Sequence, residues 1–297
     1  MKVFVTGATG FVGSAVVADL LSSGHQVLGL ARSDAAADRL IAAGATVHRG
    51  DLVDVDSLTS GAAACDGVIH TGFIHDFARF KEVCDIDARA IAALGAAVAG
   101  TAKPLVVTAG LALVASGRLA VETDAGPAPS DDYPRQSEQA AAALAARGGH
   151  VSVVRLSPSV HGDGDHGFVP MLIAIAREKG VSAYIGTGDN RWAAVARHDA
   201  ATLFRLALEK GTAGATYHGV AEQGIAFRDI AEAIGHGLGL PVVSVAAAEA
   251  AGHFGWFTGF AGLDCPASSD WTQAELTWTP RDTGLLADMN TGQYFKS

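Results

Sequence analysis

The sequence contains few cysteines, few basic residues and no long hydrophobic run. Its three cysteines, Cys65, Cys84 and Cys265, are far apart and form no C-x-x-C pair, which argues against a disulfide framework and against a zinc site. No apolar stretch reaches the roughly 18 residues of a membrane helix, and the apolar run after Lys2 stops at Gly7, too early for a signal peptide. We therefore expect a soluble, cytoplasmic protein without a bound metal.

The shortage of basic residues limits the partners that the chain could bind. The 31 acidic residues outnumber the 21 Lys and Arg residues, so the formal net charge is -10, and no local basic cluster offsets it. Such a charge repels nucleic acid and anionic membranes. Because the 297 residues are 49% apolar and only 18% charged, a disordered chain is also excluded. We expect a compact protein that acts on a small molecule, with a homodimer as an open alternative and with neither nucleic acid nor membrane as partner.

Short runs of β-branched residues alternate with longer alanine-rich stretches in the first half of the chain, a pattern typical of βαβ units. The pattern predicts strands at about residues 2–6, 26–31, 46–49, 67–70, 105–108 and 151–155. Further strands are expected at about 182–185 and 216–220, and helices at about 198–210 and 227–238. We interpret residues 1–297 as one α/β domain, a doubly wound parallel sheet of Rossmann type with a smaller C-terminal substrate lobe. Residues 1–160 would mainly bind a dinucleotide, and residues 161–297 would contribute the lobe.

A glycine-rich segment, Thr6-Gly7-Ala8-Thr9-Gly10-Phe11-Val12-Gly13, lies between the first predicted strand and a predicted helix at about residues 15–21. Gly7 and Gly10 would let the backbone turn tightly and approach a pyrophosphate, and Gly13 would let the helix pack closely on the sheet. The helix N-terminus supplies free N–H groups and the positive end of a dipole. Because the preceding strand and the following helix are both in place, the segment indicates a dinucleotide site rather than a plain β–α turn.

The end of the second predicted strand, Leu30-Ala31-Arg32-Ser33, bears on the choice of dinucleotide. NAD-binding proteins usually place a carboxylate there to hold the ribose 2′-hydroxyl, whereas a guanidinium and a hydroxyl suit a 2′-phosphate. These residues favour NADP(H) over NAD. NAD stays open, since Asp34 could reach a ribose and Arg32 could be an ordinary solvated residue.

Several motifs together resemble the extended and atypical short-chain dehydrogenase/reductase superfamily, especially its bacterial NAD(P)-dependent oxidoreductases and epimerase/dehydratases. They are the glycine motif, Gly50-Asp51-Leu52, His70-Thr71-Gly72-Phe73, the segment 155–162 and the ending Leu276-Thr277-Trp278-Thr279-Pro280. The resemblance implies that Asp51 and Leu52 border the adenine, residues 71–73 the ribose and pyrophosphate, and residues 158–160 the nicotinamide. The expected cofactor-binding residues are Gly7, Thr9, Gly10, Phe11, Val12, Arg32, Ser33, Asp51, Leu52, Thr71, Gly72, Phe73, Thr108, Pro158, Ser159 and Val160.

The chain departs from the superfamily at the positions that usually perform acid/base chemistry. Members usually carry a Ser or Thr after the fifth strand and a Tyr-x-x-x-Lys pair on the next helix. Here Gly110 takes the serine position and Thr108 offers the hydroxyl, while alignment on Tyr133 puts Ser137 at the lysine position. Alignment on Ser137 instead gives Pro134 and Glu138, so neither alignment yields the pair. A phenol without a neighbouring cation keeps a pKa of about 10 and suits a proton donor better than a base.

A second polar cluster, His161-Gly162-Asp163-Gly164-Asp165-His166, follows the sixth predicted strand and would face the nicotinamide. Its imidazoles could act as acid or base near neutral pH, or the cluster could only cap the following helix, with Asp165 as the cap. The catalytic candidates are therefore His161, Tyr133 and Thr108, and the substrate-contacting candidates are His75, His166 and Trp192. The aromatic segment 253–260 could be core, pocket wall or dimer contact.

These features predict an NADP(H)-dependent oxidoreductase that transfers a hydride to or from a small carbonyl or alcohol, or reduces an imine or enone. Two alternatives stay open. One is a relative of the sugar-nucleotide epimerases and dehydratases, and the other is an NADP-binding regulator without catalytic activity, for which loss of the acid/base pair would be expected.

Overall fold

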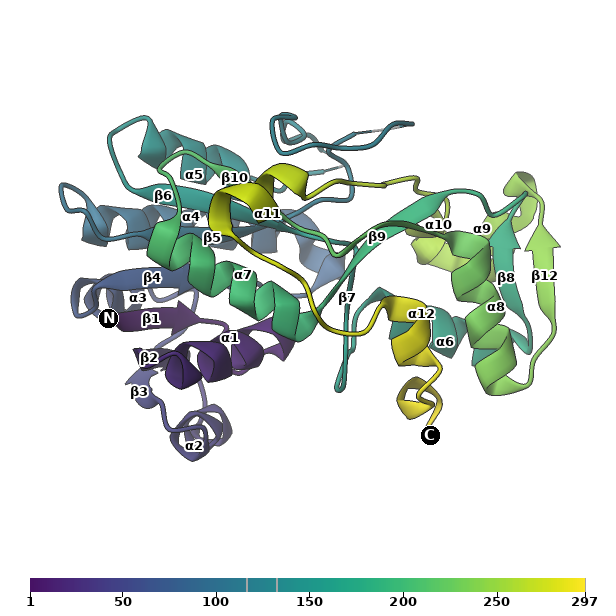
Figure 1. Cartoon of the computed structure of the whole chain (residues 1–297), viewed down its shortest axis with the longest axis horizontal. Coiled ribbons are helices and arrows are strands. Elements are labelled where there is room, and N and C mark those ends of the chain that lie inside the picture. Colours follow the sequence, from purple (N-terminus) through teal and green to yellow (C-terminus); the bar gives the residue numbers. More distant parts are fainter. Residues whose placement is uncertain (116, 132, 297) are drawn as a thin grey trace.

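The structure is a computed structural model that describes residues 1–115, 117–131 and 133–296. Figure 1 shows two parts side by side: a large sheet covered by helices, which contains the N-terminus, and a smaller lobe, beside which the C-terminus lies. In the described residues, no helix combines the length and the apolar composition needed to cross a membrane.

The large sheet has seven strands, and every pairing within it is parallel. The strands, in sheet order, are β10 (Thr216–Gly219), β6 (Val151–Leu156), β5 (Leu105–Gly110), β4 (Gly67–His70), β1 (Lys2–Thr6), β2 (Gln26–Ala31) and β3 (Thr46–Arg49). Chain order reverses between β1 and β4, and in such sheets ligands bind outside the carboxyl ends of the strands at that point. The predicted doubly wound α/β fold is confirmed.

Helices cover both faces of this sheet because successive strand residues point to opposite sides. Val3 and Val5 pack in one core cluster and Phe4 in the other. The first cluster includes residues of α1 (Phe11–Ser22), α2 (Asp34–Ala42), α7 (Arg197–Lys210) and α11 (Asp270–Leu276). The second includes residues of α3 (Val55–Ala63), α4 (Phe80–Val98) and α5 (Ser137–Ala145). Each fully buried Val, Leu or Phe of these clusters stabilises the fold by roughly 1.5–3 kcal/mol relative to an exposed one.

The smaller lobe is built from two small sheets and short helices around its own core. One sheet holds β7 (Ser159–His161), β9 (Arg191–Ala196) and β11 (Glu222–Ala226), and the other holds β8 (Ser182–Ile185) and β12 (Val242–Val245). The helices are α6 (Phe168–Lys179), α8 (Phe227–Leu238), α9 (Ala250–Phe254), α10 (Thr258–Ala261) and α12 (Leu285–Met289), with 3-10 turns η2 (Ala247–Glu249), η3 (Gly255–Phe257) and η4 (Gln293–Phe295); a further turn, η1 (Phe77–Arg79), precedes α4.

Aromatic side chains form the centre of the lobe. Trp192 is only 1% exposed and packs against Phe168 and Phe227, so this predicted substrate contact lies in the lobe core. Within the aromatic segment 253–260, Phe257 is buried in the same cluster, whereas Trp256 is 62% exposed. That segment therefore contributes mainly to the core.

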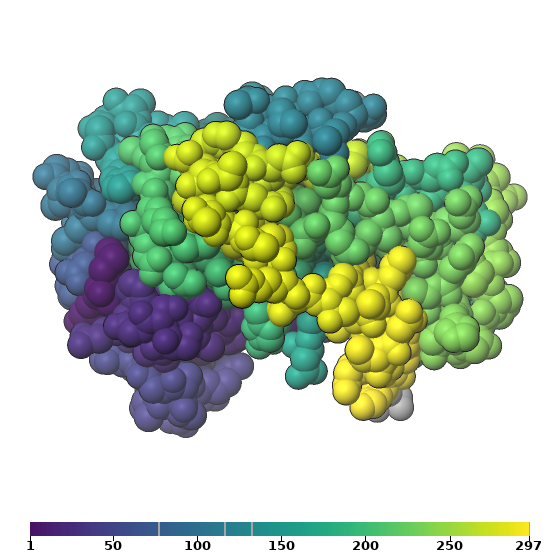
Figure 2. Space-filling model, in the orientation of Figure 1, coloured from purple at the N-terminus to yellow at the C-terminus, as the bar shows by residue number. Residues whose placement is uncertain are grey.

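The two parts are connected by more than one crossing of the chain. After the lobe begins, the chain returns to the large sheet, where α7 packs on α1 and β10 pairs with β6. The C-terminal residues, drawn in yellow in Figure 2, then cross the front of the molecule from the region of α7 to the lobe. Residues beyond 161 thus complete the large sheet as well as the lobe.

Candidate functional site

The glycine-rich turn lies between β1 and α1, where the sequence predicted it. Gly7 has a φ of +65°, and a Cβ built on it would lie 2.7 Å from the Cα of Gly72. A Cβ on Gly13 would lie 2.0 Å from the carbonyl oxygen of Gly7. Only glycine fits these positions, because a side chain would push the turn away from β4 or from α1. Helix α1 begins at Phe11 with no side chain capping its N-terminus, so its first N–H groups can bind an anion.

The other predicted cofactor contacts lie at the same edge of the sheet. The Thr71 hydroxyl donates to the carbonyl of Thr6 (2.7 Å), and Leu52 lies close to Gly72. The Thr108 hydroxyl donates to the carbonyl of His70 (2.7 Å). Residues that the sequence separates widely are therefore brought together around the turn. Within that turn Thr9, Phe11 and Val12 are partly buried and Gly10 is exposed.

The end of β2 leaves one arginine at the surface. Arg32 is exposed, and the Ser33 hydroxyl caps α2 by accepting from the N–H of Ala36 (3.2 Å). The carboxylate that could have held an NAD ribose, Asp34, forms an ion pair with Arg49 at 2.6 Å. At this edge the Arg32 guanidinium is exposed, and Asp34, whose side chain is 92% exposed, forms a surface pair with Arg49.

The chain passes through residues 157–160 from β6 into β7 of the three-stranded sheet, and β5 and β4 separate β6 from β1 in the large sheet. Ser157 donates to the carbonyl of Gly219 (2.7 Å), while Pro158 and Val160 are partly buried. The Ser159 hydroxyl is buried and has no hydrogen-bond partner within the part of the chain that the structure describes.

A buried chain of hydrogen bonds, which the sequence analysis does not predict, begins at Thr6 beside the turn. Thr6 and His70, at the ends of β1 and β4, are joined by a contact of 2.7 Å between Oγ1 and Nδ1. His70 Nε2 lies 3.1 Å from Asp87 Oδ1 on α4. A neutral ring with its proton on Nε2 satisfies both contacts, accepting from Thr6 and donating to Asp87.

The chain continues from Asp87 to the start of α5. The Ser137 hydroxyl donates to Asp87 Oδ2 (2.5 Å), and Nε of Arg135 donates to the Ser137 hydroxyl oxygen (3.0 Å). We call Thr6, His70, Asp87, Ser137 and Arg135 the Asp87 relay, because donors from both sides converge on that carboxylate. Burial raises the pKa of Asp87, but the hydrogen bonds from His70 and Ser137 and the charge of Arg135 outweigh it, so the net pKa is lowered.

Arg135 also supplies the cation that the sequence did not reveal beside Tyr133. Helix α5 begins at Ser137, so Tyr133 precedes the helix rather than opening it. Burial raises the pKa of Tyr133, the positive charge of Arg135 lowers it, and the charge of Glu138 raises it, with a net rise. The phenol therefore stays protonated at neutral pH. Desolvation, with the charges of Arg135 and His166, lowers the pKa of His75.

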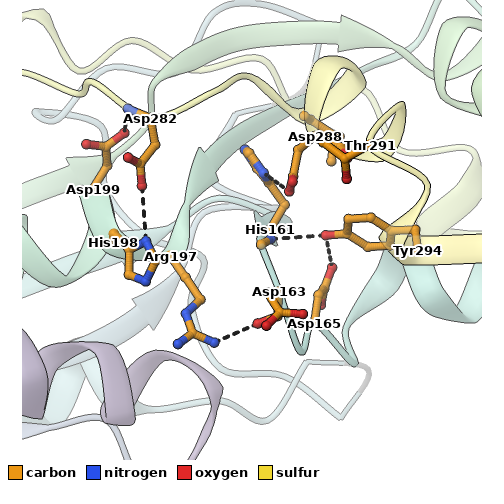
Figure 3. Close-up of polar contacts among 12 residues, drawn as sticks. His161, Asp163, Asp165, Arg197, His198, Asp199, Asp282, Asp288, Thr291 and Tyr294 are labelled. Atoms are coloured by element: carbon orange, nitrogen blue, oxygen red, sulfur yellow. Dashed lines mark hydrogen bonds and ion pairs between the residues drawn. The ribbon is translucent and has the colours of Figure 1, made fainter. Parts of the chain in front are cut away.

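The predicted His/Asp loop is tied to the C-terminal segment (Figure 3). His161 is 1% exposed, and its Nδ1 lies 3.0 Å from Asp288 of α12. The Tyr294 hydroxyl donates to Asp165 (2.9 Å) and accepts from the N–H of Gly162 (3.1 Å). We call His161, Asp165, Asp288 and Tyr294 the C-terminal clamp. Asp165 accepts from the N–H of Gly167 just before α6 (2.7 Å), and burial raises its pKa.

The same loop lies against the glycine turn. The ring centroids of His166 and Phe11 are 5.8 Å apart, and the Arg197 guanidinium carbon lies 5.2 Å from the centre of the Phe11 ring. Arg197 also donates to the carbonyl of Asp163 (2.7 Å; Figure 3). Thus His166 reaches the predicted cofactor region, whereas the His161 ring is directed to Asp288.

The structure has a separate cavity of about 580 Å³ beside α5, β6 and β10. Its lining includes the buried pair formed by Arg155 and Glu138 (2.7 Å), and none of the predicted site residues. Among the described residues, no group of three or more His, Cys, Asp or Glu side chains could hold a metal ion.

Comparisons with known proteins agree with this arrangement. A model of the NAD dependent epimerase/dehydratase family matches residues 3–220. An uncharacterized protein of Schizosaccharomyces pombe is 50% identical over 297 residues, which cover 99% of this chain and 100% of that protein. A 2-alkyl-3-oxoalkanoate reductase of Stenotrophomonas maltophilia is 32% identical over 235 residues, 74% of this chain and 69% of the reductase. A structure of dTDP-glucose 4,6-dehydratase from Streptomyces venezuelae, a double mutant with NAD bound, has a TM-score of 0.78 at 20% identity, covering 99% and 96% of the two chains.

Proposed function

The chain belongs to the NAD-dependent epimerase/dehydratase family of extended short-chain dehydrogenases/reductases, and on that premise we propose that it is an NADP(H)-dependent reductase of small carbonyl compounds. The observation that carries the proposal is the glycine turn, in which Gly7, Gly13 and Gly72 approach too closely for side chains and α1 begins without a side-chain cap, so that its first N–H groups can bind a pyrophosphate. The reductase among the relatives supports a carbonyl substrate.

The residues at the edge of the sheet fit a phosphorylated dinucleotide. The N-terminus of α1 would hold the pyrophosphate, and Arg32 with Ser33 would hold the 2′-phosphate, since Asp34 is engaged by Arg49. When bound, the nicotinamide would supply or accept the hydride. Leu52, Thr71 and Phe73 would border the cofactor on the side of β3 and β4.

We further propose Tyr133 as the proton donor in the reductive direction. Its raised pKa keeps the phenol protonated, and the nearby Arg135 would stabilise the phenolate left after donation. His161 is a weaker choice, because its ring is buried and Nδ1 is paired with Asp288. Thr108 would position the substrate or the ribose rather than transfer a proton, since its hydroxyl donates to a backbone carbonyl.

Replacement of Arg32 tests the cofactor assignment. Arg32→Ala should raise the dissociation constant for NADPH by about 10- to 100-fold, the value of a lost charge-assisted contact, and should change NADH binding little. Arg39→Ala is the matched control, because it removes an exposed arginine from α2 without touching the end of β2. Fluorescence titrations of both nucleotides give the constants. Equal losses for the two nucleotides would show that Arg32 does not select NADP(H), and absence of binding to either would reject the proposed function.

The reaction itself is tested by following NADPH oxidation with aldehydes, ketones, imines and enones. The family description favours one alternative, a sugar-nucleotide epimerase or dehydratase, for which dTDP-glucose is the probe. Conversion of that compound without net NADPH consumption would favour the alternative. Binding of NADPH without turnover of any compound would instead favour a regulator.

A further inference from the structure

The side chain of Arg135 is held in place, and no carboxylate of the described residues forms an ion pair with it. Its Nε donates to Ser137 (3.0 Å), and its guanidinium carbon lies 4.6 Å from the centre of the Phe73 ring. The hydrogen bond to Ser137 thus occupies Nε, and the Phe73 ring covers one side of the guanidinium. The two terminal nitrogens, Nη1 and Nη2, have no hydrogen-bond partner among residues 1–115, 117–131 and 133–296. We call this side of the planar, forked guanidinium the free edge, and its N–H groups are available to a ligand.

The relay behind Arg135 explains why this edge keeps its positive charge. Asp87 is 3% exposed, and its two oxygens are engaged by His70 and Ser137 rather than by the guanidinium. Ser137 thus stands between the carboxylate and Arg135. A fixed arginine whose counter-charge is used elsewhere is a binding group for an anion.

The position of Arg135 places this binding group beside the proposed reaction site. Its platform, Phe73, follows Gly72, which touches the glycine turn. Tyr133 is two residues away, and the charge of Arg135 acts on both Tyr133 and His75. The free edge of the fork therefore lies at the border of the predicted cofactor region, within the electrostatic reach of the proposed proton donor.

We propose that the free edge of Arg135 binds a carboxylate carried by the carbonyl substrate, so that the protein acts on oxo acids in preference to neutral ketones or esters. The planar fork matches the two oxygens of a carboxylate, and stacking on Phe73 limits its rotation. This inference rests on the proposed reductase function and names the substrate class for the same site. Arg135 would bind and orient the substrate, and Tyr133 would supply the proton.

The experiment compares acids with their esters. Wild type, Arg135→Gln and Arg135→Lys are assayed for NADPH oxidation with 2-, 3- and 4-oxopentanoate and with the three methyl esters. The wild type should prefer at least one acid over its ester in kcat/KM, and Arg135→Gln should remove that preference by raising KM for the acid about 10- to 100-fold. Arg135→Lys, which keeps the charge and loses the fork, should retain part of the preference. Arg89→Gln, on the exposed side of α4, is the matched control and should leave it intact.

A binding measurement separates failure of this inference from failure of the proposed function. Calorimetric titration with 4-oxopentanoate and with its methyl ester, in the presence of NADP+, reports recognition of the carboxylate without turnover. Weaker acid binding by Arg135→Gln, with unchanged NADPH affinity, supports the inference even if another reaction is catalysed. If Arg135→Gln weakens NADPH and leaves acid and ester binding alike, Arg135 belongs to the cofactor site and the inference is wrong. A wild type that binds and reduces esters as well as acids would also overturn it, while leaving the reductase function in place.

Discussion

The Asp87 relay and the C-terminal clamp use the same kinds of side chain in opposite ways. Each pairs a buried histidine with a carboxylate, at 3.1 Å for His70 and Asp87 and at 3.0 Å for His161 and Asp288. The relay runs within the sheet half and ends on the open edge of Arg135. The clamp joins a loop to the C-terminal segment through two separate sets of contacts, His161 with Asp288 and Tyr294 with Gly162 and Asp165 (Figure 3). A His–Asp pair is therefore informative about function only when the end of its network is known.

The pKa values of Asp87 in the relay and of Asp165 in the clamp are shifted in opposite directions. The pKa of Asp87 is lowered, because hydrogen bonds and the charge of Arg135 outweigh burial. The pKa of Asp165 is raised, because burial outweighs the hydrogen bonds from Gly167 and Tyr294. The surroundings of Asp87 thus favour its charged form, whereas burial of Asp165 disfavours its charged form.

Removal of the Asp87 carboxylate, at the centre of the relay, should change stability more than any other substitution. Asp87→Ala leaves the buried donors of His70 and Ser137 without an acceptor and should lower the free energy of unfolding by about 3–5 kcal/mol. Asp288→Ala should cost only about 1 kcal/mol, since the side chain of Asp288 is 23% exposed and water can replace it. Urea unfolding followed by circular dichroism measures both losses. Equal losses would remove the distinction between the two networks.

The relay and the clamp should also differ in how the stability cost of removing a carboxylate changes with pH. A carboxyl whose folded pKa is lowered stabilises the protein above its ordinary pKa of about 4, and this contribution is lost as the pH falls through the folded value. The cost of Asp87→Ala should therefore shrink on acidification. For Asp165 the folded pKa is raised, so its contribution is present at low pH and lost as the pH rises through that value. The cost of Asp165→Asn should accordingly grow on acidification.

The next effect is on turnover, and it distinguishes two candidate proton donors: Tyr133, beside the relay residue Arg135, and His161 of the clamp. Tyr133→Phe should lower kcat by about 100-fold or more, because it removes the proton donor beside Arg135, and NADPH binding should persist. His161→Ala should reduce stability more than kcat. Turnover rates and nucleotide titrations of the two variants give the answer, with Tyr184→Phe, a lobe tyrosine, as control. An active Tyr133→Phe together with an inactive, folded His161→Ala would make His161 the acid.

The smallest effect is expected from loosening the clamp. Tyr294→Phe loses the hydrogen bond to Asp165 and the acceptor for the N–H of Gly162, at a cost of about 1 kcal/mol. Because the loop also contacts Phe11 of the glycine turn through His166, the dissociation constant for NADPH should rise modestly, by less than about tenfold. Thermal unfolding and nucleotide titration measure both changes. No change in either would show that the clamp does not order the loop.

Local patterns in the sequence were sufficient to predict much of the sheet. The expected strands at 2–6, 26–31, 46–49 and 67–70 have the bounds of β1, β2, β3 and β4, because alternation and turn residues are local signals. The glycine turn was found for the same reason. Strands β7, β9, β11 and β12 were not predicted, since they are short and lie in a lobe whose core depends on distant aromatic contacts.

The site was predicted in part, and the missing members share one property. Asp87 contacts Ser137, which is 50 residues away in the sequence, and His70, which is 17 residues away. His161 and Asp288 are separated by 127 residues. No spacing rule connects residues so far apart in the chain. Arg135 was not predicted, because the family pattern expects a lysine on the helix, whereas the Arg135 guanidinium precedes the helix and is positioned by Ser137 and Phe73.

The position of β10 has a consequence for how the protein is made. β6 pairs with β5 on one side, but its other neighbour, β10, is encoded about 60 residues later. During synthesis the N-terminal strands leave the ribosome with one side of β6 unpaired until residues 216–219 follow, and an open strand edge can pair with another chain. Rapid translation through this interval, or a chaperone that covers the edge, would therefore raise the yield of folded protein.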